Sequence, residues 1–416
     1  ESCCAHNMLK LSKELFKITG DRKYADYYEN TLRNAIMGAV NKEGAFSYFT
    51  PMATGYYKFF GTADPATNMF WCCTGTGMEN YTKLGDSIYF KDGEALTVNQ
   101  YVASEAVWKE KNIKLTQSSD VTASDKAEFT VNLLNDAQPV QAKLKLRIPD
   151  WAAGDVTVKV NGQAAENKVE EQYFVLDRTW NNNDKVELTY PMEVKAFGLP
   201  DNTSVFAFKY GPTVLAAKLG REEWNDTVWA GANLSAPAYK VVGGEKVRLE
   251  LTYGKTIKQV LGTETIAIQG KDSTKEFMAN INSKLQKTDG KLEFHIRGTD
   301  AESVFGGEGL TFVPFNTLNE ERYGIYWYFE SAEDAAEEKI LAEKEEGRFA
   351  EAIVDSIQPG YQQYENDATH QMKEDKTVFE TGVSGLGSTR RAQAGGYFQY
   401  NMKVDKSKPN SLVCQF

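Results

Sequence analysis

The sequence predicts an α+β protein of several domains, in which a helical segment precedes a long series of β-strands. In residues 1–90 the apolar residues recur at helical spacing. Near residue 90 their period falls from about 3.6 to about 2 residues, which is typical of strands. A third observation is size, because 416 residues with a hydrophobic fraction of 41% can form about two to four compact cores.

The first helix is predicted over residues 7–18, in the run NMLKLSKELFKI. Its buried face is expected to consist of Met8, Leu11, Leu15 and Ile18, which lie three or four residues apart. Gly20 then provides a C-terminal stop, and Asp21 an N-cap for a second helix. Because the connection is so short, we expect the two helices to be antiparallel.

A third helix is predicted to begin near Thr74. Its inward residues are expected to be Met78, Tyr81, Gly85 and Ile88. Between the second and third helices, residues 41–68 form a long stretch that is rich in aromatic residues, Gly and Pro. Long loops within compact domains are usually functional, so this stretch is a candidate for substrate contacts.

After residue 90, short alternating runs separated by turn residues predict β-sandwich architecture. The predicted domains are residues 1–90 (helical), 91–195 and 196–330 (two β-sandwiches), 331–348 (a charged helical linker) and 349–416 (a truncated accessory β-domain). The chain starts at Glu1 without a Met and ends in a strand-like run, so we expect it to be an internal part of a longer protein.

The charge balance restricts the partners. A formal net charge of −11 disfavours nucleic acids and anionic membranes, because phosphate groups would be repelled. No run of about 18 apolar residues is present, so no transmembrane helix is expected. The sequence leaves the oligomeric state open, and it is compatible with either a cytoplasmic or an exported protein.

Four of the five cysteines form two adjacent pairs, Cys3–Cys4 and Cys72–Cys73. Five cysteines in a chain of this length do not indicate a disulfide framework. Thiolates are soft ligands that suit zinc. One sulfur of the first pair and both of the second would leave one tetrahedral position, for which Glu1 and His6 are the nearest candidates.

Local geometry favours a particular ligand set. In an extended segment Glu1 and Cys3 would point to the same side. Gly75 and Gly77 make plausible a sharp turn that brings both later cysteines towards one ion. The common C-x-x-C spacing of zinc folds is absent, so buried free thiols are the alternative interpretation.

Five segments of the chain resemble known enzymes. They are ESCCAHNMLKLSKELF, FWCCTGTGMENYTKLGDSIYF, LRIPDWA, FKYGPTVLAAK and ERYGIYWYF. In this order they resemble the bacterial β-L-arabinofuranosidases of glycoside hydrolase families 127 and 146, and the CC-x-G-T-G-M-E-N form is closer to family 146. The resemblance, which extends essentially from Glu1 to Phe416, implies the C-terminal helices of an (α/α)6 barrel followed by β-sandwich domains.

The resemblance also implies a zinc site and a mechanism. Zinc would be held by Glu1, Cys3, Cys72 and Cys73. Cys72 would be the catalytic nucleophile, which attacks the anomeric carbon and gives net retention through a thioglycosyl-enzyme. The general acid/base of the family is a Glu upstream of the Glu-x-Cys motif, so we expect residues 1–416 to be inactive alone.

Three further residues are candidate substrate contacts. Tyr48 lies in the aromatic loop, Trp71 precedes the predicted nucleophile, and Glu29 lies among tyrosines on the second helix. Their alternatives are loop packing, core packing and a solvated helix face, respectively. His6 is expected to support the site through a hydrogen bond to Glu1 rather than as a ligand.

Two functions from different classes remain. The first is a zinc-dependent retaining glycosidase that acts on β-L-arabinofuranosides of plant cell-wall glycans. The alternative is a non-catalytic carbohydrate-binding or scaffold protein, in which zinc only joins two segments. A thiol redox protein is disfavoured, because vicinal cysteines do not have the spacing of a redox motif.

Overall fold

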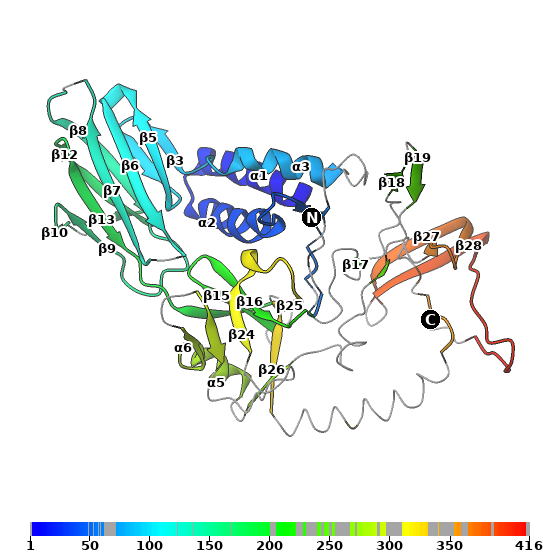
Figure 1. Ribbon diagram of the computed structural model, residues 1–416. Coiled ribbons are helices and arrows are strands. Elements are labelled where there is room, and N and C mark those ends of the chain that lie inside the picture. Colours follow the sequence, from blue (N-terminus) through cyan, green and yellow to red (C-terminus); the bar gives the residue numbers. More distant parts are fainter. Residues whose placement is uncertain are drawn as a thin grey trace.

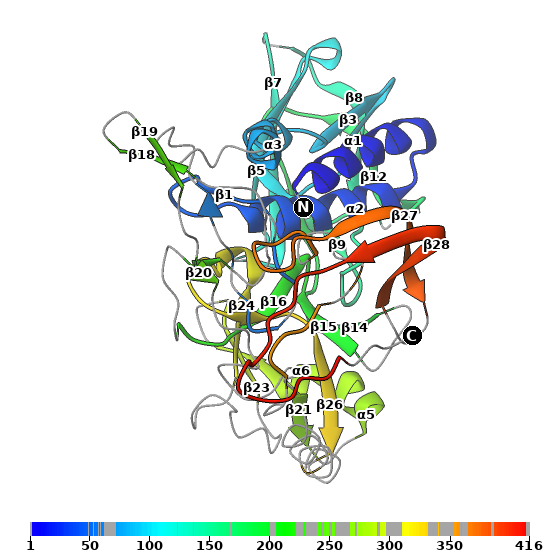
Figure 2. The same ribbon diagram turned by 90° about the vertical axis from the view of Figure 1, so that its right-hand side faces the viewer.

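In the described part of the chain, the computed structural model comprises an N-terminal helical segment, two β-domains and a hairpin near the C-terminus (Figures 1 and 2). The described residues are 2–48, 50–52, 54–56, 58, 60–61, 72–122, 124–135, 137–166, 168–199, 205–221, 228–229, 239–242, 245–248, 252–253, 267–270, 273–288, 292–296, 310–331, 340, 353–357, 359, 365–383 and 387–412. The predicted α+β class is confirmed, whereas the (α/α)6 barrel stays a prediction.

The helical segment begins with an antiparallel pair. Its elements are α1 (Ser2–Thr19), α2 (Arg22–Thr31), a π-helical turn (Leu32–Ile36), a 3₁₀ turn (Met37–Ala39), α3 (Cys72–Asn80) and a second 3₁₀ turn (Tyr81–Lys83). Gly20 has a φ of 68°, and the Asp21 carboxylate accepts a hydrogen bond of 3.0 Å from the Lys23 amide. The predicted stop and N-cap are therefore confirmed.

The predicted inward face of α1 is wrong. Leu11 is 50% exposed and Ile18 79% exposed. The side chains that α1 buries are Ser2, His6, Leu9, Ser12 and Phe16. This stripe has helical spacing but is largely polar, and two of its polar members, Ser2 and His6, hydrogen-bond to Asn80 of α3. A search for apolar periodicity alone therefore selects the neighbouring, more exposed stripe.

The predicted inward face of α3 is also wrong, apart from Ile88. Met78 is 54% and Tyr81 52% exposed, and Gly85 is exposed too, whereas Ile88 is buried. The residues that α3 buries are Cys73, Thr74, Gly77 and Asn80. They are small or polar because α3 lies close to α1 and to β1 (Phe46–Ser47).

Gly77 shows how close this approach is. A Cβ atom at Gly77 would lie 2.6 Å from the Phe46 ring, so only glycine fits there. The ring in turn packs edge-on against Tyr81, with 5.9 Å between centroids. Phe46 thereby fixes the start of the aromatic loop against the helix that carries the second cysteine pair.

The first β-domain is a sandwich of two sheets. The six-stranded sheet has the order β10 (Gln163–Ala164), β9 (Thr157–Val160), β13 (Asp184–Thr189), β7 (Lys126–Leu133), β6 (Ile113–Asp120) and β5 (Val102–Trp108). The five-stranded sheet has the order β11 (Val169–Glu170), β12 (Tyr173–Trp180), β8 (Val140–Arg147), β4 (Ala95–Val98) and β3 (Tyr89–Asp92). Alternate residues of both sheets, among them Leu115, Phe129 and Leu144, share one core.

The second β-domain is built on a nine-stranded sheet. Its strands are β14 (Val194–Gly198), β15 (Val205–Tyr210), β16 (Thr213–Lys218), β21 (Ala267–Gly270), β22 (Leu285–Lys287), β23 (Phe294–Ile296), β24 (Thr311–Pro314), β25 (Tyr323–Gly324) and β26 (Trp327–Ser331). Helices α5 (Thr274–Ala279) and α6 (Ile281–Lys284) contribute Phe277 and Ile281 to its core. A 3₁₀ turn (Phe315–Thr317) follows β24.

Smaller elements complete the described part of the chain. They are β2 (Phe60–Gly61), β17 (Val228–Trp229), β18 (Tyr239–Val242), β19 (Glu245–Arg248), β20 (Thr252–Tyr253), β27 (Lys373–Val383) and β28 (Gly387–Gln399). The predicted linker 331–348 lies outside the described residues except for positions 331 and 340. Among the described helices, none combines the length and apolar character needed to span a membrane.

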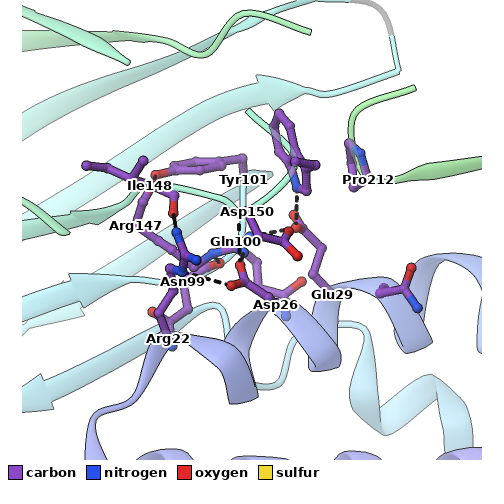
Figure 3. A network of polar contacts seen from close by, with 12 residues as sticks. Arg22, Asp26, Glu29, Asn99, Gln100, Tyr101, Arg147, Ile148, Asp150 and Pro212 are labelled. Atoms are coloured by element: carbon purple, nitrogen blue, oxygen red, sulfur yellow. Dashed lines mark hydrogen bonds and ion pairs between the residues drawn. The ribbon is translucent and has the colours of Figure 1, made fainter. Parts of the chain in front are cut away.

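A buried ion cluster joins α2 to the first sandwich (Figure 3). Arg147, at the end of β8, has no exposed surface. Its guanidinium pairs with the Asp26 carboxylate, lies 2.7 Å from Glu29 Oε2, and donates from Nε to the Asn99 carbonyl at 2.6 Å. Trp151, four residues on, donates from its indole N–H to the same Glu29 oxygen at 2.8 Å.

The positive charge of Arg147 determines the ionisation state of Glu29. Burial acts to raise the pKa of this carboxyl, but the Arg147 charge and the hydrogen bonds from Arg147 and Trp151 outweigh burial and lower the pKa. Glu29 is therefore ionised at neutral pH. The LRIPDWA segment supplies both partners, so its function in the fold is to fasten the sandwich to α2.

Two other recognisable segments make similar junctions. The FKYGPTVLAAK segment contacts Asn34, which lies in the π-helical turn. The Asn34 side chain donates a hydrogen bond to the Pro212 carbonyl and accepts one from the Val214 backbone N–H, both at 2.9 Å. The ERYGIYWYF segment holds the aromatic loop: Arg322 donates to the Gly55 carbonyl at 2.6 Å and Tyr323 to the Pro51 carbonyl at 2.5 Å. The second β-domain is thus fastened both to the π-helical turn and to the aromatic loop.

Replacing Arg147 with Met should destabilise the protein by about 3–5 kcal/mol, because buried Glu29 loses its ion-pair partner and Asp26 keeps only Arg22, at 2.9 Å. Chemical denaturation at neutral pH measures this change. The control is Lys145→Met, two residues earlier on the same strand, where the side chain is only half-buried; it should change the free energy of unfolding by less than about 0.5 kcal/mol.

The pH dependence of the free energy of unfolding should also change sign in Arg147→Met. In the wild type the lowered pKa of Glu29 contributes stability above its usual value of 4.5, and this stability is lost as the pH falls further. In Arg147→Met, the Arg147 charge no longer offsets the burial of Glu29, so the pKa of this carboxyl should rise. Acid should then stabilise the variant, and adding Glu29→Gln should recover part of the loss at neutral pH. Equal losses in Lys145→Met and Arg147→Met would contradict this account of the junction.

Candidate active site between the starts of two helices

The starts of α1 and α3 bring two cysteines together. Cys3 Sγ lies 3.0 Å from Cys73 Sγ, although the residues are 70 positions apart in the sequence. Each cysteine is the second residue of its helix. Further along, Lys13 contacts Asp86 at 2.7 Å, so the contacts advance in the same direction on both helices and the helices are parallel.

The two thiols differ in their surroundings. Cys73 is 1% exposed, whereas Cys3 is half-buried and Cys4 is exposed. The Thr76 hydroxyl, one turn after Cys73, lies 3.0 Å from Cys3 Sγ. Cys3 is therefore the member of the first pair that faces α3, while Cys4 points elsewhere, as the predicted ligand set requires.

A buried polar network joins the start of α1 to the end of α3. His6 Nδ1 lies 2.8 Å from Asn80 Oδ1, and the Asn80 amide donates to Ser2 Oγ at 2.7 Å. On its other side, His6 Nε2 is 3.6 Å from the largely exposed Glu79 carboxylate. His6 thus bridges α1 and α3 and sets their separation next to the thiols. The predicted hydrogen bond from His6 to Glu1 lies outside the described residues.

Several predicted site residues are not available for comparison. Glu1 and Trp71 lie outside the described residues, and so does the side chain of Cys72, although Cys72 is the first residue of α3. One geometric expectation needs correction. Cys3 is in the first turn of a helix rather than in an extended entry, so alternation along a strand does not place it on the same side as Glu1.

The described donors fit a zinc ion in type and spacing. Two sulfurs bound to tetrahedral zinc at about 2.3 Å would be about 3.8 Å apart. The observed 3.0 Å requires them to separate by less than about 1 Å, which side-chain rotation can supply. Among the described residues no three metal-ligating side chains converge. Glu1 and Cys72 would have to supply the other two ligands.

Tyr48 and Glu29 have different positions. Tyr48 is half-buried and directly follows β1, which packs on α3 through Phe46. Its loop therefore starts beside the thiol pair. Glu29 instead faces the first sandwich, is 3% exposed, and is fully engaged by Arg147 and Trp151. We assign Glu29 a structural function, because both of its partners belong to the first sandwich and its side chain is buried against them.

The sequence interpretation missed two groups near the loop and helices. One is Asn80, whose amide joins the helices and to which no function was assigned. The other is Lys58, which is 2% exposed; it donates to the Phe315 carbonyl at 2.8 Å and lies 4.0 Å from the centre of that ring. Burial lowers the pKa of Lys58 to about 7. A lysine within the aromatic run YYKFF was the available signal.

Comparison with known proteins supports one family. Residues 1–86 match the family model described as "Beta-L-arabinofuranosidase, GH127 catalytic domain", and residues 95–192 match "Beta-L-arabinofuranosidase, GH127 middle domain". The first match includes the helices that carry the thiols. The second includes the sandwich fastened to them through Arg147.

Curated and solved relatives agree with these matches. A "Non-reducing end beta-L-arabinofuranosidase" of Bifidobacterium longum subsp. longum is 22% identical over 234 residues, covering 52% of this chain and 35% of the relative. Among solved structures, Ara127N-Se, a GH127 β-L-arabinofuranosidase from Geobacillus stearothermophilus T6, has a TM-score of 0.53 at 16% identity, covering 79% of this chain and 50% of that one.

A further solved GH127 β-arabinofuranosidase has a TM-score of 0.51 at 19% identity, covering 79% of this chain and 49% of that one. The chain thus spans about a third of the curated relative and about half of the two solved chains. The comparisons support the GH127 β-L-arabinofuranosidase family, while the finer assignment to family 146 stays a prediction.

Replacing Asn80 with Ala should destabilise the helical segment by about 1–3 kcal/mol, because buried His6 and Ser2 each lose a hydrogen-bond partner. Urea denaturation measures the change. The matched control is Met78→Ala on the exposed side of the same helix, which should be nearly neutral. If both variants unfold at the same urea concentration, the network does not hold the helices together.

Proposed function

We propose that the chain, which the comparisons connect to GH127, is the thiol-bearing part of a zinc-dependent retaining β-L-arabinofuranosidase that acts on arabinofuranosides of plant cell-wall glycans. The observation that carries the proposal is the 3.0 Å contact between Cys3 and Cys73. Two residues of the implied ligand set, distant in sequence, meet at the starts of adjacent helices. The identification of the substrate rests on the resemblance and on what the relatives are named for.

Glu1, Cys3, Cys72 and Cys73 would hold the zinc ion. When bound, zinc would keep the cysteines ionised at neutral pH. The protein contributes the rest of the site. The His6–Asn80–Ser2 network holds the first turns of α1 against the end of α3. The Thr76 hydroxyl contacts Cys3 and limits its rotation, so that Cys3 stays directed towards α3.

The nucleophile would be Cys72, the residue at which α3 begins. Its sulfur would attack the anomeric carbon, forming a carbon–sulfur bond as the bond to the leaving oxygen breaks. Water would then displace the sulfur from the opposite side, so that two inversions give net retention. Tyr48, in the aromatic loop, and Trp71, which precedes the nucleophile in the sequence, would contact the sugar.

The leaving oxygen needs a general acid. Of the carboxylates discussed, Glu79 is largely exposed and directed to His6. Arg147 lowers the pKa of Glu29, whereas a proton donor at neutral pH needs a raised pKa. This agrees with the resemblance, in which the acid lies outside residues 1–416, and we propose that these residues alone do not turn over substrate.

Zinc binding should depend on Cys3 and Cys73 but not on Cys4. We expect about one zinc per chain by elemental analysis of the purified protein, and a loss of more than about tenfold in zinc affinity in Cys3→Ser and Cys73→Ser. Cys4→Ser is the matched control, because it removes an exposed neighbouring thiol. Equal retention of zinc by all three variants would exclude the proposed ligand set.

A thiol-reactive arabinofuranose analogue should label Cys72 selectively in the full-length protein, as mass spectrometry of the digested protein would show. Residues 1–416 alone should hydrolyse an aryl β-L-arabinofuranoside at least about 10²-fold more slowly than the full-length protein, because general-acid catalysis is absent. Zinc binding without labelling would favour the non-catalytic scaffold. Turnover by the isolated residues near the full rate would place the acid within them.

A further inference from the structure

We propose that Lys58 makes the docking of the aromatic loop on the second β-domain depend on protonation. The loop is held firmly while the Lys58 amine is uncharged and loosely once the amine binds a proton. The described residues 50–52, 54–56 and 58 form the docked part of the loop, the loop arm. The inference goes beyond the proposed function, because it needs neither zinc nor a glycoside.

Most contacts of the loop arm keep the same charge around neutral pH. The Gly55 N–H donates to the Tyr323 carbonyl at 2.8 Å, and the Tyr323 N–H donates to the Tyr56 carbonyl at 3.0 Å. Arg322 donates to the Gly55 carbonyl at 2.6 Å, and its guanidinium stays charged. The Tyr323 hydroxyl donates to the Pro51 carbonyl, and burial raises the pKa of this phenol, so it stays protonated.

Lys58 is different because its charge can change. The side chain is 2% exposed, and Nζ donates to the Phe315 carbonyl at 2.8 Å. An ammonium group has three N–H donors. Beyond this one oxygen, the described residues offer it ring faces: Nζ lies 4.0 Å from the centre of the Phe315 ring and 6.0 Å from that of Tyr323. The site therefore satisfies a neutral amine better than an ammonium.

The charged neighbours on the adjoining segment are directed elsewhere. Glu321 Oε1 lies 3.9 Å from Lys218 Nζ, and the Arg322 guanidinium binds the Gly55 carbonyl. Burial is the cause that lowers the pKa of Lys58 from 10.5 to about 7, and no carboxylate of the described residues opposes it. The positive charge of a docked Lys58 is thus left without a counter-charge in the described part of the chain.

The direction of the pH effect follows from the two states. In the docked arm the pKa of Lys58 is about 7, whereas an undocked lysine in water regains its usual pKa. Undocking therefore takes up a proton between these two values, and docking weakens as the pH falls through this window. Below a pH of about 7 both states are protonated, so docking stays at its weakest.

The start of the loop is anchored separately. The Phe46 ring packs edge-on against Tyr81, with 5.9 Å between centroids, and occupies the space above Gly77. These contacts do not depend on the charge of Lys58. Undocking would therefore move the loop arm away from the second β-domain while Phe46 stays in place beside α3.

Hydrogen exchange of the full-length protein tests the proposal. Peptides that contain Gly55 or Tyr323 are followed by mass spectrometry, and each rate is divided by the intrinsic rate at the same pH. Protection of these two amides should be at least about tenfold lower at about pH 6.5 than at about pH 8.5. Peptides from β8 (Val140–Arg147) are the internal reference and should change by less than about twofold. Equal protection of the loop arm at both pH values would contradict the proposal.

Variants identify the titrating group. Lys58→Met is uncharged and should show equal protection at both pH values, whereas Lys58→Arg stays charged and should be weakly protected at both. The matched control is Lys42→Met, because Lys42 is an exposed lysine of the same loop; it should keep the wild-type pH dependence. A pH dependence that persists in Lys58→Met would assign the effect to another group, such as Glu321, and overturn the proposal.

The wild-type comparison needs no variant, so it decides the question even if a variant fails to fold. These readouts use neither glycosidase activity nor zinc binding. A protein that fails the labelling test but shows the pH-dependent protection would reject only the proposed function, and the reverse result would reject only this inference.

Discussion

The buried Arg147 guanidinium is the interaction on which the rest of the arrangement depends (Figure 3). A buried charge is tolerated only when its hydrogen-bonding groups are satisfied in fixed directions. Asp26 and Glu29 on α2 and the Asn99 carbonyl meet this requirement together. The end of β8 therefore fits α2 in one position only. Since α2 is the antiparallel partner of α1, the same cluster positions the helix that carries Cys3.

The other junctions are polar for the same reason. The Asn34 side chain hydrogen-bonds to Pro212 and Val214, at the turn between β15 and β16. Arg322 and Tyr323 donate hydrogen bonds to backbone carbonyls of the aromatic loop. Apolar contacts tolerate sliding, whereas such hydrogen bonds are lost if either partner shifts by about 1 Å. The β-domains thus act as rigid supports that hold the helices and the loop at defined places, which is what a site composed of distant residues needs.

Sequence predicted those features that local chemistry dictates. Gly20 and Asp21 marked the boundary between α1 and α2 because a positive φ and a side-chain cap are local requirements. Alternating runs marked the strands. The buried faces of α1 and α3 were mispredicted, because the stripe through His6 and Asn80 is polar and its hydrogen bonds cross between helices. The pairing of Cys3 with Cys73 was inferred from thiol chemistry and from the resemblance, since no periodic pattern at either cysteine indicates a partner 70 residues away.

Because α1 and α3 are parallel, their N-termini lie side by side, and anionic groups are favoured between them. Each helix carries a partial positive charge at its start, and two starts side by side repel each other. Negative charge between them offsets that repulsion, and a neutral pair of hydroxyls would not. The small and polar residues at the contact, Ser2, Thr76 and Gly77, allow the helices to approach closely enough for both starts to act on the same group. The fold thus brings two partially positive helix N-termini together, and the cysteine thiolates are groups that can neutralise this charge.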